Sequence, residues 1–207
     1  MTFPKLLMVL RHGQTAWNAE ERFQGRLDIP LNERGRSQAK GHGEALKKLL
    51  QNKAIDPRRV CVHASPLGRA QETARIACET AGIPIKIQND GRLAEQYYGE
   101  WEGKLFQEIR TAYPDVWAMR LNDPLSYTPK GGEPGSSVKK RMTEALLESE
   151  EIGLFVSHFG LVRVLVQLCR DYGFKMPENI REIMGRQNLL YYLEEGELHV
   201  IESSASS

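Results

Sequence analysis

The chain has 207 residues, of which 41% are hydrophobic, and it carries 28 Lys and Arg residues against 27 Asp and Glu residues. This length is enough for one substantial core, so we expect a globular protein whose residues 1–207 form a single domain. The formal net charge of +1 excludes a long-range field that would attract nucleic acid or an anionic membrane. Any anion-binding site must therefore be local.

The cysteines and the first apolar run indicate the compartment. Cys61, Cys78 and Cys169 are far apart and form no CxxC pair, which is typical of reduced thiols and argues against a disulfide framework or a zinc site. The first apolar run is interrupted by Pro4 and Lys5 and is too short for a signal peptide or a membrane span. We therefore expect a cytoplasmic protein.

The first half of the chain alternates between predicted strands and helices. Lys5–Leu10 is a continuous apolar run and predicts a buried strand. Asn32–Asn52 predicts a helix with its first residue as the N-cap, and Val60–Ala64 predicts a second strand. In the helix that follows, Ser65 is the expected N-cap and Gly82 is the expected end.

The middle of the chain is less regular. Ile83–Gln88 predicts a third strand, but the periodicity is then lost from about Gly91 to Ser137, a stretch that contains four prolines. We interpret residues 91–137 as an irregular excursion with short helices that covers a ligand pocket, and not as a separate domain. A helix over Val138–Glu151 and a strand over Gly153–Val156 are expected next.

The last third of the chain completes an alternating pattern. Leu161–Arg170 is almost wholly apolar and predicts a buried helix, and residues 188–202 predict a hairpin with its turn at Glu195 and Gly196. The terminal segment SSASS, residues 203–207, is expected to fray. Strands that alternate with helices predict an α/β fold in three α/β/α layers with a mostly parallel sheet.

Three predicted strands end in residues that favour anions. The first strand runs into Arg11 and His12, the second contains His63 and is followed by Arg69, and a later strand leads to His158. Each of these residues alone is more commonly a surface or hydrogen-bonded residue. In a parallel sheet, however, the carboxyl ends of the strands meet at one edge, where ligands bind. Guanidinium groups, imidazoles and a helix N-terminus at one place favour phosphate.

A phosphate site becomes catalytic when it has a nucleophile and an acid. A neutral His12 can attack phosphorus, and neighbouring cations favour the neutral ring. Glu95, Glu100 and Glu102 are candidates for the acid that protonates the leaving alcohol. The residues alone do not choose among these three carboxyl groups.

Several motifs occur in a fixed order between residues 10 and 165, and the ordered set is far more specific than any one of them. With them the chain resembles the histidine phosphatase superfamily, in its phosphoglycerate mutase-like branch and on the phosphatase side of it. The resemblance implies the three-layer fold of that family. It rests on the segments "LRHGQTAWN", "RFQGRLDIPLNERGRSQA", "SPLGRAQETA", "LAEQYYGEWEG", "GGE" and "SHFGLVRVL".

The resemblance also implies a role for each matching residue. His12 matches the histidine that becomes phosphorylated, and Glu95 matches the acid. Arg11, Arg69 and His158 match residues of the phosphate pocket. Three further positions match residues that contact the phosphate or the substrate: Asn18, Gln24 and Tyr98.

The implied reaction needs no metal and no other cofactor. We expect a phosphomonoesterase that hydrolyses a small phosphorylated metabolite through a phosphohistidine. One alternative is a mutase that moves phosphate between hydroxyl groups; the compact segment over residues 91–137 disfavours it, because mutases of the family tend to have a larger insertion there. The other alternative is a non-catalytic binder of a phosphorylated ligand, which the presence of both His12 and Glu95 disfavours.

Two features bear on the shape of the pocket. Phe159 follows His158 where the family usually has glycine, so we expect either an altered backbone there, because positive φ is costly for phenylalanine, or a ring that lines the pocket. The excursion over residues 91–137 carries four aromatic residues that could favour a ring or an apolar tail on the substrate, although core is the default for the tryptophan: Tyr97, Tyr98, Trp101 and Tyr127.

Overall fold

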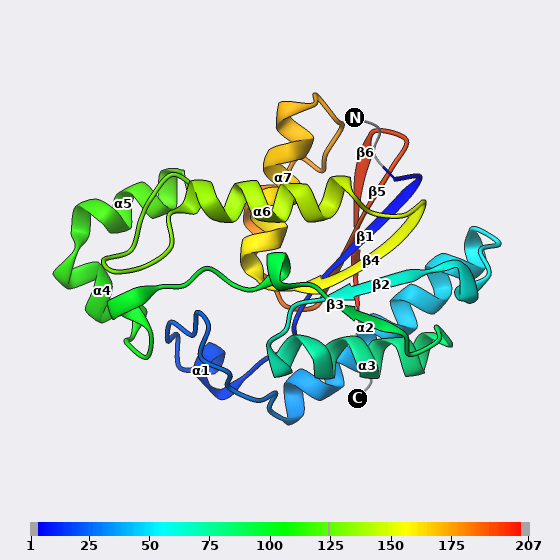
Figure 1. Cartoon of the computed structure of the whole chain (residues 1–207), viewed down its shortest axis with the longest axis horizontal. Helices are drawn as coiled ribbons and strands as arrows, with labels where there is room; N and C mark the ends of the chain where they lie inside the picture. Colours follow the sequence, from blue (N-terminus) through cyan, green and yellow to red (C-terminus); the bar gives the residue numbers. More distant parts are fainter. Residues whose placement is uncertain (1–3, 124, 204–207) are drawn as a thin grey trace.

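The architecture comes from a computed structural model, which describes residues 4–123 and 125–203. Six strands form one sheet in the order β3-β2-β4-β1-β5-β6 (Figure 1). The first four strands of that order are parallel, β5 is antiparallel to β1, and β6 is antiparallel to β5. The strands span Leu6–Arg11 (β1), Cys61–Ala64 (β2), Ile87–Asn89 (β3), Ile152–Ser157 (β4), Leu189–Glu194 (β5) and Glu197–Glu202 (β6).

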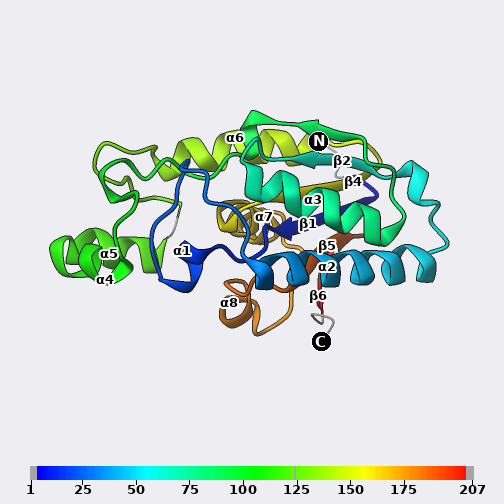
Figure 2. The same ribbon diagram turned by 90° about the horizontal axis from the view of Figure 1, so that it is seen from below.

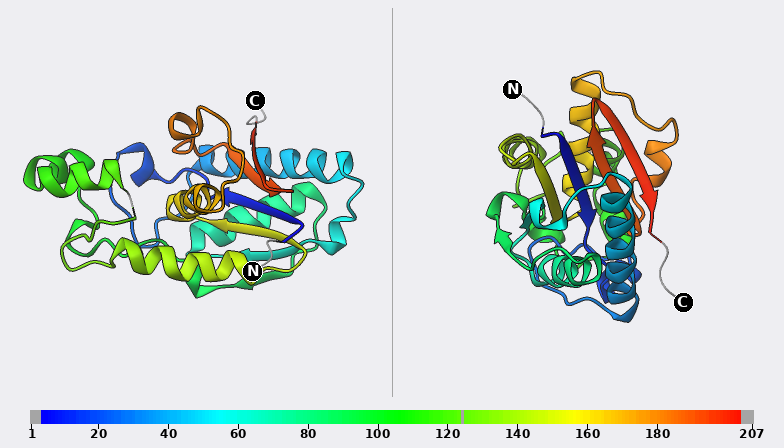
Figure 3. Two further views of the ribbon diagram at one scale, coloured as in Figure 1. Left: turned by 90° about the horizontal axis from the view of Figure 1, so that it is seen from above. Right: turned by 90° about the vertical axis from the view of Figure 1, so that its right-hand side faces the viewer.

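Helices cover both faces of the sheet, which confirms the predicted α/β/α layers. α2 and α3 pack together on one face, and α6 and α7 cover the other (Figures 2 and 3). The longer helices are α2 (Glu33–Asn52), α3 (Gly68–Ala81), α6 (Gly135–Leu147) and α7 (Phe159–Asp171). The shorter ones are α1 (Ala16–Ala19), α4 (Phe106–Ala112), α5 (Pro114–Asn122) and α8 (Ile180–Ile183), with 3-10 turns η1 (Pro57–Arg59), η2 (Gly91–Leu93) and η3 (Gly99–Trp101).

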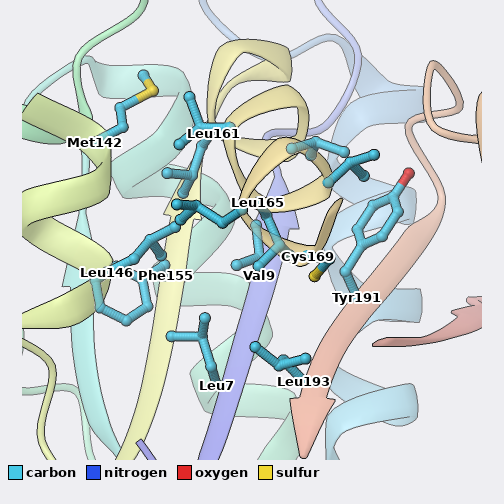
Figure 4. Close-up of a cluster of buried hydrophobic side chains, with 14 of the residues drawn as sticks. Leu7, Val9, Met142, Leu146, Phe155, Leu161, Leu165, Cys169, Tyr191 and Leu193 are labelled. Atoms are coloured by element: carbon cyan, nitrogen blue, oxygen red, sulfur yellow. The ribbon is translucent and has the colours of Figure 1, made fainter. Parts of the chain in front are cut away.

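β1 lies inside the sheet, and its apolar side chains alternate between two hydrophobic clusters. Leu7 and Val9 pack with side chains of α6 and α7 (Figure 4). Leu6, Met8 and Leu10 pack on the opposite face with side chains of α2 and α3. A strand that is buried on both faces has a continuous run of apolar residues, which is why the sequence predicts β1 well.

The predicted N-cap of α2 is confirmed, and that of α3 is wrong. The side chain of Asn32 accepts a hydrogen bond from the backbone N of Gly35 at 2.8 Å. α3 begins only at Gly68, three residues after Ser65. Ser65 is fully buried, and its Oγ lies 2.7 Å from Nε2 of His158, so its hydroxyl contacts the histidine and does not cap the helix. Gly82 ends α3 as predicted, with φ 74° in the left-handed region that glycine tolerates.

The third strand and the helix α6 differ from their predicted bounds. β3 covers only Ile87–Asn89, and the preceding residues do not join the sheet: Pro84 has no N–H to donate, and Ile85 is 53% exposed. α6 begins at Gly135 and ends at Leu147, several residues before the predicted end. α7 begins two residues earlier than predicted, directly after His158.

The C-terminal hairpin is confirmed, including its turn. Glu195 and Gly196 have φ 48° and 78°, which are the two positive values that a tight two-residue hairpin turn requires. The expected fraying of the terminal segment is wrong for Ser203, which is buried and donates its backbone N–H to the carbonyl of Asn188 at 2.8 Å. Residues 204–207 lie outside the described residues.

Residues 91–137 form the expected irregular excursion with short helices. α4 and α5 lie at one end of the molecule, beyond the carboxyl end of β1 (Figure 2). A separate, mainly aromatic cluster supports them, formed by four aromatic residues and one isoleucine: Phe23, Tyr98, Trp101, Tyr127 and Ile109. We call residues 96–137 the roof, and we call the ends of β1 to β4 together with the residues that follow them, up to Glu95 after β3, the floor. No helix within residues 4–123 and 125–203 is long and apolar enough to cross a membrane.

Candidate active site

The floor of the site is formed where two parallel strands end side by side. Arg11 of β1 pairs with Ser157 of β4, so His12 and His158 follow at the same edge. The backbone N of His12 donates to the carbonyl of Ser157 at 2.8 Å, and the two imidazole rings meet edge to face with centroids 5.1 Å apart. The parallel register therefore brings together two histidines that are 146 residues apart in the chain.

The tautomer of His12 is set by its own backbone. Nδ1 lies 2.7 Å from the carbonyl oxygen of Gly13, which can only accept, so Nδ1 carries the proton and Nε2 keeps its lone pair. Burial lowers the pKa of His12 well below its usual value, and the nearby charges of Arg69 and Arg11 lower it further. The ring is therefore neutral near pH 7, as expected; burial is a larger cause of the lowered pKa than the like charges that the sequence suggested.

The two arginines of the floor are held by backbone carbonyls. Nη1 and Nη2 of Arg69 donate to the carbonyls of Leu27 and Gly25, both at 2.7 Å, and Nη1 of Arg11 donates to the carbonyl of Gly185 at 2.6 Å. The Nε atoms of both arginines are buried and have no hydrogen-bond partner among the described residues. Buried donors without partners cost free energy, so they indicate a ligand that accepts from them.

His158 lies behind His12 and caps α7. Its Nε2 is 2.7 Å from Oγ of Ser65, and its Nδ1 is buried without a partner among the residues that the structure describes. Burial lowers the pKa of His158 well below its usual value, with further contributions from Arg69 and His12. A neutral ring with one unused nitrogen therefore stands at the N-terminus of α7, where backbone amides favour an anion.

Glu95 is the only one of the three candidate carboxyl groups, all of which are described, that lines the pocket. Its Oε1 accepts from the backbone N of Gln96 at 2.9 Å, and a Cβ at Gly160 would come within 2.6 Å of that oxygen. Glu102 instead accepts from the backbone N of Arg26 at 2.8 Å. Glu100 forms an ion pair with Lys130 on the surface at 3.1 Å.

Sequence reasoning missed a second arginine–carboxylate unit that holds Glu95 in place. Arg141 of α6 donates to the carbonyls of Ala94 at 2.5 Å and Glu95 at 3.2 Å, and it pairs with Glu133 at 2.8 Å. Burial acts to raise the pKa of Glu133, but the hydrogen bond and charge of Arg141, together with the charge of Arg26 and the backbone N–H of Tyr97, outweigh it, and the net pKa is lowered. The motif "GGE" contains Glu133 and could have indicated this unit, but the sequence alone assigned no role to that glutamate.

The predicted binding residues Asn18 and Gln24 also line the pocket. The hydroxyl of Thr15 links them: it lies 2.9 Å from Oε1 of Gln24 and accepts from the backbone N of Asn18 at 3.2 Å. The side chain of Gln187 donates to Oδ1 of Asn18 at 3.0 Å, and the carbonyl of Gln187 lies 3.0 Å from Nε2 of the buried His42. The loop before β5 thus supports Asn18, a contact that no sequence motif indicated.

The expectation of an altered backbone at Phe159 is wrong, and the expectation of a pocket-lining ring is confirmed. Phe159 is the first residue of α7 and is not among the described residues with positive φ. Its ring lies against two guanidinium groups, 5.3 Å from Arg11 and 5.1 Å from Arg163, and lines the pocket. The glycine that this site requires is Gly160, where a side chain would displace Glu95.

Of the four aromatic residues expected over the pocket, only Tyr98 lines it. Trp101 and Tyr127 are fully buried and stack on each other with ring centroids 5.8 Å apart, so they are core residues of the roof. Tyr97 is 41% exposed. His63, at the end of the second strand, points elsewhere: its Nε2 is 2.8 Å from Oε2 of Glu150.

One pocket therefore collects seven of the eight residues singled out from the sequence, and His158 lies directly behind it. Its lining comprises Arg11, His12, Asn18, Arg22, Phe23, Gln24, Gly25, Arg69, Glu95, Tyr98, Phe106, Arg120 and Phe159. Within the described parts of the chain, no three His, Cys, Asp or Glu side chains are grouped so as to hold a metal ion. The pocket therefore combines several guanidinium groups with one neutral imidazole and one carboxyl group.

This arrangement agrees with the comparison with known families. The profile of the histidine phosphatase superfamily (branch 1) matches residues 7–196, and the chain belongs to this family. Phosphoglycerate mutase-like protein 4 of Arabidopsis thaliana is 33% identical over 83% of this chain and 74% of its own length. Glucosyl-3-phosphoglycerate phosphatase of Mycolicibacterium vanbaalenii is 32% identical over 77% of this chain and 71% of its own length.

Other relatives carry different names. A 2,3-bisphosphoglycerate-dependent phosphoglycerate mutase of Bifidobacterium longum is 44% identical, but over 53% of this chain and only 42% of its own length. Among solved structures, a mycobacterial glucosyl-3-phosphoglycerate phosphatase in complex with VO3 has a TM-score of 0.70 and 25% identity, with 98% of this chain and all of that chain covered. Phosphatases and mutases thus both stand among the relatives.

Proposed function

We propose that the protein is a metal-independent phosphomonoesterase that hydrolyses a small phosphorylated metabolite through a phosphohistidine on His12. The observation that carries the proposal is the joint geometry of three groups in one pocket: the unprotonated Nε2 of His12, the partnerless Nε donors of Arg11 and Arg69, and the carboxyl group of Glu95. Phosphatase-named relatives along most of the chain support the same reaction class.

In the first step, Nε2 of His12 attacks phosphorus while the ester P–O bond breaks. Glu95 gives its proton to the leaving oxygen, which departs as a neutral alcohol. The Nε donors of Arg11 and Arg69 bind the equatorial oxygens of the phosphoryl group, where the charge of the transition state is spread. Nε2 of His158 lies 2.7 Å from the hydroxyl of Ser65. We assign this hydroxyl as the donor, so that Nδ1 of His158 carries a proton that it donates to the same phosphoryl group.

In the second step, water attacks the phosphohistidine. The carboxylate of Glu95 takes one proton from the water, the oxygen bonds to phosphorus, and the P–N electron pair returns to Nε2 of His12. Inorganic phosphate leaves, and Glu95 is again protonated. Since the protein supplies both proton transfers and all the positive charge, this route needs no metal or other cofactor.

Mutase activity is the second candidate, and the 44% identity to a mutase over 110 residues favours it. The same His12 and Glu95 would serve, with an acceptor hydroxyl in place of water. The compact roof, with only seven and nine residues in α4 and α5, argues for access of water and therefore for hydrolysis. The cytoplasmic location expected from the sequence stays a prediction.

The test is release of phosphate from 4-nitrophenyl phosphate in excess EDTA. We expect turnover by the native chain, loss of it in His12→Ala, and little change in His199→Ala, which removes a histidine of β6 outside the pocket. A protein-bound phosphate that is stable in alkali and labile in acid should be trapped on the native chain only. Turnover that survives His12→Ala, or that stops with EDTA, would overturn the mechanism. Efficient isomerisation of 3-phosphoglycerate with its bisphosphate primer would favour the mutase.

A further inference from the structure

The loop before β5, residues 185–188, contacts two residues of the pocket although it lies outside the motifs that predicted the site. The carbonyl of Gly185 accepts from Nη1 of Arg11 at 2.6 Å, and Nε2 of Gln187 donates to Oδ1 of Asn18 at 3.0 Å. Arg11 and Asn18 both line the pocket, whereas neither Gly185 nor Gln187 does. An effect of the loop on a bound ligand therefore passes through other residues.

The side-chain amide of Asn18 can take only one of its two orientations. The backbone N of Thr15 donates to Oδ1 of Asn18 at 3.1 Å. A backbone N–H is only a donor, so the oxygen of the amide must be the atom on this side. Because Asn18 lines the pocket, its Nδ2, with two N–H groups, is left for a ligand there.

Gln187 supplies the second hydrogen bond that fixes this orientation. The hydroxyl of Thr15 has a single proton, for which Oδ1 of Asn18 at 3.1 Å and Oε1 of Gln24 at 2.9 Å compete. Nε2 of Gln187 has no such competition in its contact with Oδ1. An oxygen that only accepts also requires Gln187 to present its nitrogen, so the orientations of both amides agree.

The packing of α1 alone holds Asn18 weakly. The helix has four residues, none of which is buried, and the contacts of Asn18 with Thr15 lie within the cap of the same short helix. Gln187 is 169 residues further along the chain, so its hydrogen bond connects α1 to a different part of the molecule. This contact therefore restricts the position of Asn18 in a way that the local turn does not.

The loop is itself fixed on both sides of the Gln187 side chain. The carbonyl of Gln187 lies 3.0 Å from Nε2 of His42, a fully buried residue of α2. The carbonyl of Asn188 accepts from the backbone N and from Oγ of Ser203, both at 2.8 Å. Since α2 and the residue after β6 hold the backbone of the loop, the amide of Gln187 is presented from a fixed point.

We infer that Gln187 is a positioning residue of the phosphate pocket, which holds the amide of Asn18 with Nδ2 directed toward a bound phosphoryl group. Gln187 itself contacts neither the phosphate nor the reacting atoms. The inference rests on the part of the proposed function that places a phosphoryl group at His12. It predicts that the amide of Gln187 strengthens phosphate binding only while Asn18 is present.

The experiment measures the binding of inorganic phosphate by titration calorimetry, which does not depend on turnover. Gln187→Met keeps the length of the side chain and removes its donor. We expect the dissociation constant of phosphate to rise about fivefold, as the loss of one neutral hydrogen bond would provide. For 4-nitrophenyl phosphate, kcat/KM should fall by a similar factor.

The matched control is Asn188→Ala, which removes the amide side chain of the next residue in the loop. Nδ2 of Asn188 donates to Oε1 of Glu202 at 3.0 Å, and Asn188 does not line the pocket. The dissociation constant of phosphate should therefore keep its native value. Thermal unfolding of each variant shows whether it is folded before its phosphate binding is compared.

A double-mutant cycle separates positioning from a purely structural role of the loop. In an Asn18→Ala chain, Gln187→Met should change the dissociation constant of phosphate by less than about twofold, because the group through which Gln187 acts is gone. If Asn18→Ala does not fold, Asn18→Ser takes its place, since a hydroxyl can still accept from the backbone N of Thr15.

The outcomes separate this inference from the proposed function. Unchanged phosphate binding in Gln187→Met, or an equal loss with and without Asn18, would overturn the role of Gln187 and leave the hydrolysis intact. The expected cycle in a chain whose turnover does not depend on His12 would support the role of Gln187 and overturn the hydrolysis. A native chain that binds no phosphate would overturn both.

Discussion

The floor and the roof of the pocket are built on different physical principles. The floor takes its charged residues from the ends of parallel strands, and each one is held by a backbone or hydroxyl partner, as Arg69 is by two carbonyls. The roof takes its residues from short helices supported by an aromatic cluster around Trp101. The floor is therefore fixed by the hydrogen-bonded sheet, whereas the roof depends on the packing of a few side chains. We expect reaction chemistry to reside in the floor and substrate choice in the roof.

The largest expected effect comes from removing the acid of the floor. Glu95→Gln should lower kcat for an alkyl phosphate by about 10³-fold, in the range usual for the loss of a general acid or base. The loss should be smaller for 4-nitrophenyl phosphate, because a nitrophenolate needs less protonation as it leaves. Steady-state rates on both esters test this prediction.

The matched control for that prediction is Glu100→Gln. It removes a roof carboxyl group whose partner is Lys130 on the surface, so activity should change little. An equal loss of kcat for the alkyl and the nitrophenyl ester in Glu95→Gln would contradict the role of Glu95 as the acid. It would indicate that Glu95 only helps to position the other residues of the floor.

The next effect concerns the stability of the roof. Trp101 is fully buried, and its ring centroid lies 5.3 Å from that of Phe23 and 5.8 Å from that of Tyr127. Trp101→Ala should lower the free energy of unfolding by about 3–5 kcal/mol, as large-to-small changes of buried aromatic residues do. Urea unfolding measures it, with the exposed Tyr97→Ala as the control, for which we expect a change within about 0.5 kcal/mol.

A small effect of Trp101→Ala on the free energy of unfolding would contradict the view that an aromatic core holds the roof in place. It would show that the roof does not share in the cooperative unfolding of the sheet and that its aromatic cluster is not a stabilising core. In that case the pocket would be closed by contacts with the ligand.

Acid should destabilise the sheet and the helices packed on it, because His12, His42 and His158 are buried in their neutral form. Burial lowers the pKa of His42 to about 4, against the opposing effect of its hydrogen bond to the carbonyl of Gln187. A base with a lowered pKa binds its proton more readily when unfolded, so stability is complete above about pH 6.5 and falls as the pH drops toward 4. His12 and His158 shift in the same direction.

For His42 alone, this lowering corresponds to about 3 kcal/mol between pH 6.5 and 4. Urea midpoints measured across this range should fall with pH, and His42→Gln should remove part of the slope. No histidine lies in residues 91–137, so histidine protonation in the roof adds nothing to this dependence. A variant with the native slope would contradict the assignment to His42.

The sequence predicted the floor better than the roof, for physical reasons. The burial of β1 on both faces leaves a continuous apolar run, and the parallel register then carries Arg11 and His12 to the same edge as His158. The residues alone left three glutamates open as the acid, and only the family resemblance pointed to Glu95. The contacts of Arg141 join segments far apart in the chain, so no local pattern predicted its role. For the same reason, Ser65 was expected to cap a helix although its partner is His158.

The smallest effect tests how tightly the floor holds its acid. A Cβ at Gly160 would lie 2.6 Å from Oε1 of Glu95, which is the end of a flexible side chain and can move aside. Gly160→Ala should therefore leave the free energy of unfolding almost unchanged while kcat falls about tenfold, because a shift of the acid by less than 1 Å weakens proton transfer to the leaving oxygen. Gly91→Ala, with open space around the added Cβ, is the matched control and should keep native kcat. If Gly160→Ala lost stability and kept kcat, the requirement for glycine would belong to helix packing, and the position of Glu95 would be less critical than the floor's other contacts suggest.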